Sequence, residues 1–199
     1  MKAFSLDYLI SEVNQTVQLA NPESLRLGTV SGVRYVMRRI GIELVCGYTQ
    51  DEQILIMHGK YRIPDRVMLI EDIYDTEGYF SKDHFGYRVT SGIVTGKRLE
   101  YRESPLELLF PNVKHGTAFM AYHHLYTDQQ GNILIPEVAY TACYLYCCYK
   151  LLDLVGNPRN PKWQERAQML AHAQNAIFEA RGELNKTTQP VHRTTRILQ

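Results

Sequence analysis

The chain has few of the residues that define the specialised classes of protein. Its 199 residues include 4 Cys, 1 Trp, 13 Gly and 8 Pro. These numbers exclude a collagen-like or low-complexity chain and a disulfide-dense scaffold. A hydrophobic content of 45% is ordinary and excludes a disordered chain. The length is sufficient for one domain with a real core, or for one core that carries an inserted module.

A charge excess of either sign is also lacking. The 22 Lys and Arg residues almost balance the 21 Asp and Glu residues, which leaves a net charge of +1. The chain therefore lacks the strongly basic character of most nucleic-acid-binding domains. The charge is unevenly distributed, however, because residues 51–136 carry 9 basic and 12 acidic side chains, a net of −3, whereas residues 186–199 carry +3 and no acid.

Long hydrophobic runs are absent. The most apolar segment, residues 138–152, contains several Tyr and Cys and is shorter than the ~20 residues of a membrane span. We interpret it as a buried helix and expect no membrane association. Asp7 comes too early for the apolar region of a secretory signal. Because three of the four Cys cluster at residues 143–148, we expect reduced, buried thiols and synthesis in the cytosol.

Tyrosine, by contrast, is abundant. The chain has 14 Tyr, and four of them fall on the segment that we predict to be a buried helix: Tyr140, Tyr144, Tyr146 and Tyr149. Tyr is favoured where an apolar surface must also form hydrogen bonds, as in protein interfaces. Composition therefore favours a protein that interacts with other proteins.

Hydrophobic spacing predicts two helices near each end of the chain. The first spans residues 5–19, with Ser5 as N-cap and Asn21-Pro22 as its end. The second spans residues 29–45, the third residues 138–154, and the fourth starts at Pro161 and ends near residue 184. In the fourth helix the expected buried stripe is Trp163, Ala167, Leu170, Ala171, Gln174, Ile177 and Phe178.

Between these helices, short β-rich runs alternate with turn residues. We expect strands at residues 54–57 and 66–73, at 87–95 and 97–102, and at 119–126 and 133–135, paired as hairpins. The predicted fold class is therefore α+β. Residues 1–52 and 137–185 form a helical bundle of about four helices, residues 53–136 form an inserted antiparallel β module, and residues 186–199 form an extended C-terminal arm.

Three patterns suggest enzyme chemistry, and each has a simpler explanation. Residues 92–98 resemble a phosphate-binding loop, but only three residues separate the glycines, and Arg98 stands where Ser or Thr would bind magnesium. His123 and His124 could join the cysteines around zinc, but adjacent side chains of a strand point to opposite faces. The serines at 31, 91 and 104 lack a nucleophile elbow.

The carboxylates Glu71, Asp72, Asp75 and Glu77 are interpreted as a solvated face. We therefore predict that the chain is not an enzyme and that it has no catalytic, cofactor-binding or metal-binding residues. A small metal- or nucleotide-dependent enzyme remains the alternative of a different class.

Two stretches of the sequence combine apolar runs with a turn in a distinctive order. Residues 54–74 (ILIMHGKYRIPDRVMLIEDIY) resemble the strand, "xLP" turn and second strand of the head–tail connector (adaptor) proteins of tailed phages, with Ile63 in place of Leu. Residues 121–137 (AYHHLYTDQQGNILIPE) are similar to the strand and turn that precede a Tyr-rich helix in the same neck proteins. Residues 160–181 resemble their last long helix, and the order of elements agrees over most of the chain.

The resemblance implies a structural virion protein of a tailed phage, of the kind with a short tail. Many copies, twelve in the family, would form a homo-oligomeric ring in the neck, which joins the portal protein to the next neck or tail ring protein. Genomic DNA would pass through the channel without sequence-specific binding. The expected location is the virion neck, assembled in the host cytoplasm, and another tail or capsid component is the alternative within virions.

The resemblance also implies a role for the C-terminal arm. Apolar residues lie there next to cations, as in segments that fold onto a partner. The candidate contacts with the portal or with a neighbouring subunit are Lys186, Pro190, Val191, His192, Arg193, Arg196, Ile197 and Leu198. The alternative is a disordered terminus without a partner.

Overall fold

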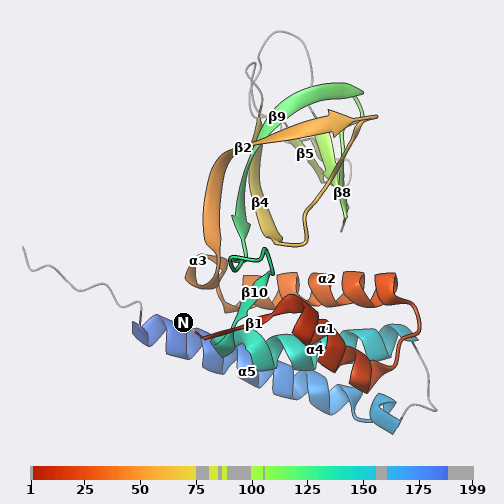
Figure 1. Cartoon of the computed structure of the whole chain (residues 1–199), viewed down its shortest axis with the longest axis vertical. Helices are drawn as coiled ribbons and strands as arrows, with labels where there is room; N and C mark the ends of the chain where they lie inside the picture. Colours follow the sequence, from red (N-terminus) through yellow and green to blue (C-terminus); the bar gives the residue numbers. More distant parts are fainter. Residues whose placement is uncertain are drawn as a thin grey trace, which may run out of the picture.

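The structure is a computed structural model that describes residues 2–74, 81–84, 87–88, 100–104, 106–155 and 161–187. The larger sheet lies to one side of the helices, whereas two short strands near the chain's N-terminus and before the fourth helix lie among the helices (Figure 1). The chain is therefore an α+β protein, which confirms the predicted class. One buried cluster of apolar side chains lies mainly among the helices and a second lies within the sheet.

The helices of the described residues come from both ends of the chain. They are α1 (Leu6–Val17), α2 (Pro22–Ile40), α3 (Ile42–Val45), α4 (Glu137–Val155), the short 3-10 helix η1 (Pro161–Trp163) and α5 (Arg166–Thr187). Helix α4 contacts α1, α2 and α5, and these four contribute most of the first cluster. Because the surface of α4 is apolar on nearly every side, it needs packing partners on several sides, and these three helices provide them.

The starts of α1 and α2 follow from capping side chains. Ser5 accepts a hydrogen bond from the Tyr8 amide at 3.1 Å, as the sequence predicts. The first helix ends at Val17, within two residues of its predicted end and before Asn21-Pro22. The Asn21 side chain also accepts from the amides of Glu23 and Ser24, and Pro22 begins α2. The predicted start at residue 29 is therefore wrong by two turns.

The predicted second helix is also divided at its C-terminal end. Gly41 has φ of 125°, which no residue in a right-handed helix adopts, and it separates α2 from α3. The chain then enters the sheet at Gly47, six residues before the predicted start of the β module.

Small residues allow α2 and α4 to cross closely. A Cβ at Gly32 would lie 2.5 Å from Sγ of Cys147, and one at Gly28 would lie 2.3 Å from Cδ2 of Leu151. The Cys147 thiol also donates a hydrogen bond to the Thr29 carbonyl at 3.4 Å. Glycine lowers helix propensity, but at this crossing the lack of a side chain is what admits the neighbouring helix.

Helix α5 buries a different face from the one predicted. Its buried residues are Ala173, Ile177, Ala180 and Leu184, which follow a helical repeat. Of the predicted stripe only Ile177 is buried, whereas Ala167, Ala171, Gln174 and Phe178 are exposed. Most of the predicted stripe therefore faces outward.

The described strands form an eight-stranded sheet in the order β4-β9-β2-β3-β8-β7-β5-β6. Their bounds are β2 (Gly47–Met57), β3 (Lys60–Arg62), β4 (Val67–Tyr74), β5 (Ser81–His84), β6 (Tyr87–Arg88), β7 (Glu100–Glu103), β8 (Glu107–Leu109) and β9 (His115–His124). All pairs are antiparallel except β5 with β7, which corrects the purely antiparallel expectation.

Strand pairing differs from the predicted hairpins. Strand β9 lies between β2 and β4, so the two segments on either side of residues 58–65 do not pair with each other. Strand β10 (Leu134–Pro136) pairs with β1 (Ala3–Ser5) in a separate two-stranded sheet rather than with β9. The predicted hairpin of residues 119–126 with 133–135 is therefore present only at its turn, where Thr127 and Ile133 form an isolated antiparallel bridge and the Leu134 amide donates to the Tyr126 carbonyl at 2.8 Å.

The segment between β9 and β10 is a tight turn organised by Asp128. Its carboxylate accepts hydrogen bonds from the amides of Gln130 and Asn132 and from the Asn132 side chain, at 2.8–2.9 Å. These bonds, chiefly that from the Asn132 side chain, lower the pKa of Asp128. This turn directs the chain from the sheet back to β10 and α4.

Arginines of α2 connect the helices to the start of β4. Arg34 donates to the Val67 carbonyl at 2.7 Å and to the Pro64 carbonyl at 3.2 Å. Arg38 donates to the Met68 carbonyl from both Nε and Nη2, at 3.2 and 2.9 Å. Met68 also belongs to the helical core, so α2 and β4 are joined by polar and apolar contacts together.

Candidate functional site

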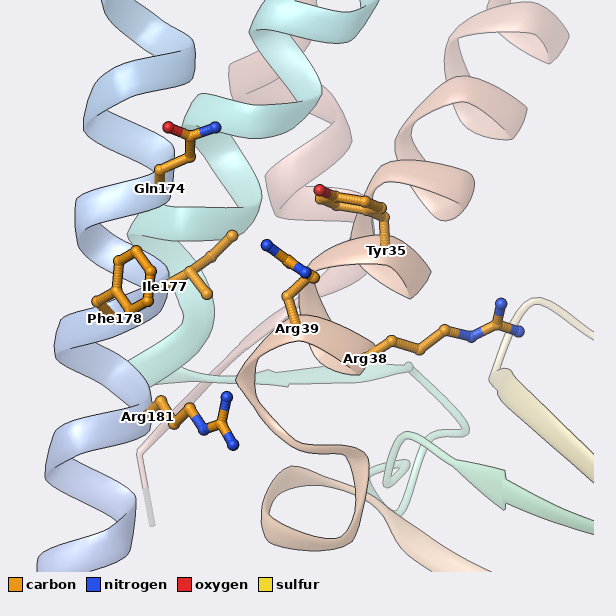
Figure 2. A pocket seen from close by; sticks show the side chains of 7 residues that line it. All are labelled: Tyr35, Arg38, Arg39, Gln174, Ile177, Phe178 and Arg181. Atoms are coloured by element: carbon orange, nitrogen blue, oxygen red, sulfur yellow. The ribbon is translucent and has the colours of Figure 1, made fainter.

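A pocket lies between the C-terminal half of α2 and the middle of α5 (Figure 2). Its volume is about 210 Å³, and it is lined by Tyr35, Arg38, Arg39, Gln174, Ile177, Phe178 and Arg181. We call it the arginine groove. Three of its seven lining residues are cations and none is an acid, so the groove has a local positive charge that the net charge of the chain conceals.

Two of the three guanidinium groups are available to a ligand. Figure 2 shows Arg39 of α2 and Arg181 of α5 extending into the space between the helices, while Arg38 points away toward β4. Arg38 is held there by the Met68 carbonyl. Among the described residues neither Arg39 nor Arg181 has a hydrogen-bond or ion-pair partner, and both are exposed.

The other residues of the groove are apolar or neutral, and some of them pack against the helical core or against another ring. Ile177 is 7% exposed and belongs to the helical core, whereas Phe178 beside it is 68% exposed. The Tyr35 ring stacks on Tyr146 of α4, with ring centroids 4.3 Å apart and planes at 11°. Helix packing and ring stacking therefore hold the surface in shape before any ligand binds.

This chemistry is suited to a carboxylate flanked by an apolar group. A guanidinium offers paired donors that match the two oxygens of a carboxylate. The Gln174 amide adds a neutral donor and acceptor, and Phe178 offers exposed apolar area next to the cations. A surface of this kind, with Arg and an aromatic ring at its centre, is typical of protein contacts.

The predicted arm is described only at its start. Helix α5 extends to Thr187, so Lys186 lies in its last turn, on the exposed surface, and not in an extended segment. A lysine at this position interacts favourably with the helix dipole. The other candidate contacts, from Pro190 to Leu198, lie outside the described residues.

The cysteines are buried, and their thiols are therefore unreactive. All four are free, and Cys143, Cys147 and Cys148 are fully buried in α4. Burial raises the pKa of Cys148 to about 11 and that of Cys46 to about 12, and it raises those of the other two thiols as well. Within the described ranges no group of His, Cys, Asp or Glu is arranged to hold a metal ion.

The other candidates for enzyme chemistry form hydrogen bonds within the fold, lie exposed on a strand, or lie outside the described residues. Ser31 accepts a hydrogen bond from Lys150 at 2.8 Å between α2 and α4, and Ser104 bonds to the backbone of Glu107. Glu71 and Asp72 are exposed on β4, as predicted for a solvated face. Ser91, Asp75, Glu77 and the loop at residues 92–98 lie outside the described residues.

The tyrosines of α4 contact the protein's own helices. Tyr140 donates a hydrogen bond to Glu12, and the hydroxyls of Tyr144 and Thr16 lie 2.8 Å apart. Tyr146 stacks on Tyr35 and packs near Tyr149. These rings, which composition suggested as contacts for other proteins, therefore serve helix packing first.

Comparison of the sequence with protein-family models and with curated proteins finds no match. No helix in the part of the chain that the structure describes is both long and apolar enough to cross a bilayer. The arginine groove was missed in the sequence because its cations come from helices at opposite ends of the chain. The adjacent cations Arg38 and Arg39 indicate a basic end of α2 in the sequence, but they do not indicate that α5 lies beside it.

Proposed function

We propose that the chain is a structural protein of a phage neck, many copies of which form a ring that joins the portal to the tail and continues the DNA channel. In this proposal it is not an enzyme, and it carries no cofactor. Its partners are further copies of itself, the portal protein and the next neck or tail ring protein.

One observation carries the proposal. Helices that precede the sheet in the sequence share a core with helices that follow it, while the sheet has its own core. We infer from this that α1, α2, α4 and α5 form one bundle into which the sheet is inserted. That is the order of elements implied by the resemblance to head–tail connectors, and it gives each copy two unlike parts with which to contact different neighbours.

Two further features support an assembly role. The buried thiols and the structural partners of Ser31 and Ser104 leave those groups without an evident catalytic use. The arginine groove offers a preformed surface for a protein contact. A closed ring requires two different patches on each copy, and a groove on one side of the helices provides one of them.

The test is the mass of the complex formed with the portal protein of the same phage. We expect the purified chain to form a ring-sized assembly when the portal is present, measured by mass photometry or analytical ultracentrifugation. A chain that stays monomeric at high concentration with portal present would sink the proposal.

A second experiment addresses the arm. Removing residues 188–199 leaves α5 intact, since the helix ends at Thr187. We expect this deletion to weaken binding to the portal or to neighbouring copies without lowering thermal stability. Unchanged binding would show that the arm does not serve as the contact.

A further inference from the structure

The eight-stranded sheet carries an acidic surface on its edge. Within the described residues β4 is the outermost strand on one side. The pairing of β4 with β9 is irregular between Ile70 and Asp72, which leaves Glu71 out of the regular ladder. As a result two consecutive acids, Glu71 and Asp72, are both exposed. We call this pair the acidic edge.

One side chain of the protein lies close to the acidic edge. Oε1 of Glu71 lies 3.3 Å from Nε2 of His123, and the Glu71 side chain is still 44% exposed. Charged residues on an edge strand disfavour uncontrolled pairing with other sheets. They also leave a negative patch that can be recognised by a cationic surface of matching size.

We propose that the arginine groove of one copy binds the acidic edge of the next copy, with Arg39 and Arg181 contacting Glu71 and Asp72. This inference rests on the proposed ring, for which it names the contact between subunits. The two patches are different and lie on different elements, as the head-to-tail contact of a ring requires.

Charge decides between the possible occupants. The chain's own C-terminal segment, residues 186–199, has three cations and no acid, so the groove would repel it. Residues 51–136, which include the acidic edge, have a net charge of −3. Of the segments of this chain, the sheet therefore complements the groove best, and a second copy is the nearest source of it.

Charge-reversed variants test this pairing. The groove variant is Arg39→Glu/Arg181→Glu, and the edge variant is Glu71→Lys/Asp72→Lys. Each alone places like charges at every contact, so we expect the yield of ring on the portal to fall roughly tenfold or more. All four positions are exposed, so circular dichroism and the melting temperature should match those of the unmodified chain.

The decisive step is to mix the two variants in equal amounts. The reversed groove then meets the reversed edge, and the natural groove meets the natural edge, so a ring with an even number of alternating copies has attractive contacts throughout. We expect assembly to recover. The matched control is Arg62→Glu/Lys114→Glu, which makes the same change in charge at two exposed cations outside the groove; it should assemble normally and should not rescue the edge variant.

The outcomes separate this inference from the proposed function. If the unmodified chain forms rings and the groove variant forms them equally well, the contact is wrong and the ring proposal stands. If both variants fail and the mixture does not recover, the groove binds something other than the acidic edge, such as the portal or a nucleic-acid phosphate. If the unmodified chain never assembles on the portal, both proposals fail.

Discussion

At the scale of single residues, close packing explains choices that propensity alone does not. Gly32 disfavours a helix, yet it lies in the middle of α2 because Sγ of Cys147 occupies the space that a Cβ would need. The small thiol and the glycine form one fitted contact. A change at either residue is therefore expected to depend on the other.

Gly32→Ala should destabilise the protein by about 1–3 kcal/mol, because the added methyl overpacks the crossing of α2 and α4. The free energy of unfolding in urea measures this. The control is Gly182→Ala in α5, where a Cβ would meet no atom within 4 Å and the better helix propensity should add up to about 1 kcal/mol.

Combining Gly32→Ala with Cys147→Ala should recover part of the loss, because the second change removes the sulfur that the new methyl would contact. A coupling of about 1 kcal/mol or more is expected between the two sites. Strictly additive effects would contradict the close contact described here.

The thiols permit a chemical test at the same scale. Because all four cysteines are buried and burial raises their pKa values, to about 11 for Cys148 and about 12 for Cys46, little thiolate forms at pH 8 in the folded protein. In native buffer we expect a disulfide reagent such as DTNB to label none of the four cysteines during the time that it needs to label all four in guanidinium. One cysteine reacting at the unfolded rate in native buffer would contradict this burial.

At the scale of elements, local signals in the sequence were informative and long-range pairing was not. The N-cap at Ser5 and the apolar surface of α4 led to correct helices, since both depend on near neighbours. The start of α2 at Asn21-Pro22 was missed because the same pair can end one helix or begin the next. The partner of β10 could not be foreseen, because β1 lies at the other end of the chain.

The misassigned face of α5 has a physical explanation. Large apolar residues such as Phe178 attract attention in a sequence, but two of the four buried residues of α5 are small ones, Ala173 and Ala180. Small residues permit close helix approach and give a weak hydrophobic signal. Three residues of the predicted stripe, Gln174, Ile177 and Phe178, line the arginine groove.

The link between α2 and β4 should depend on Arg34. Replacing it by Met keeps the apolar stem but removes the hydrogen bonds to the Val67 and Pro64 carbonyls. We expect a loss of about 1.5–3 kcal/mol, because hydrogen bonds with a charged donor are stronger than those between neutral groups. Urea denaturation of the purified variant would measure it.

Arg39→Met is the matched control for this change, since Arg39 lies on the same helix and has no bonding partner among the described residues. Its stability should stay within about 0.5 kcal/mol of the unmodified chain. Equal losses for the two variants would mean that the hydrogen bonds to β4 contribute little.

At the scale of the whole molecule, the near-zero net charge conceals an uneven distribution of charged residues. The sheet segment is negative and the C-terminal segment is positive, and the helices add a groove lined by arginines. The net charge of +1 does not reveal this distribution. The groove became visible only when the fold brought α2 and α5 together, so no reading of spacing along the chain could have located it.

The central claim is that copies of this chain form a closed ring around a channel, and electron microscopy of the complex with the portal tests it most directly. We predict a ring with rotational symmetry seated on the portal, in which α5 and the groove of one copy face β4 of the next. Single copies scattered on the portal, or an open filament without a central channel, would contradict the account.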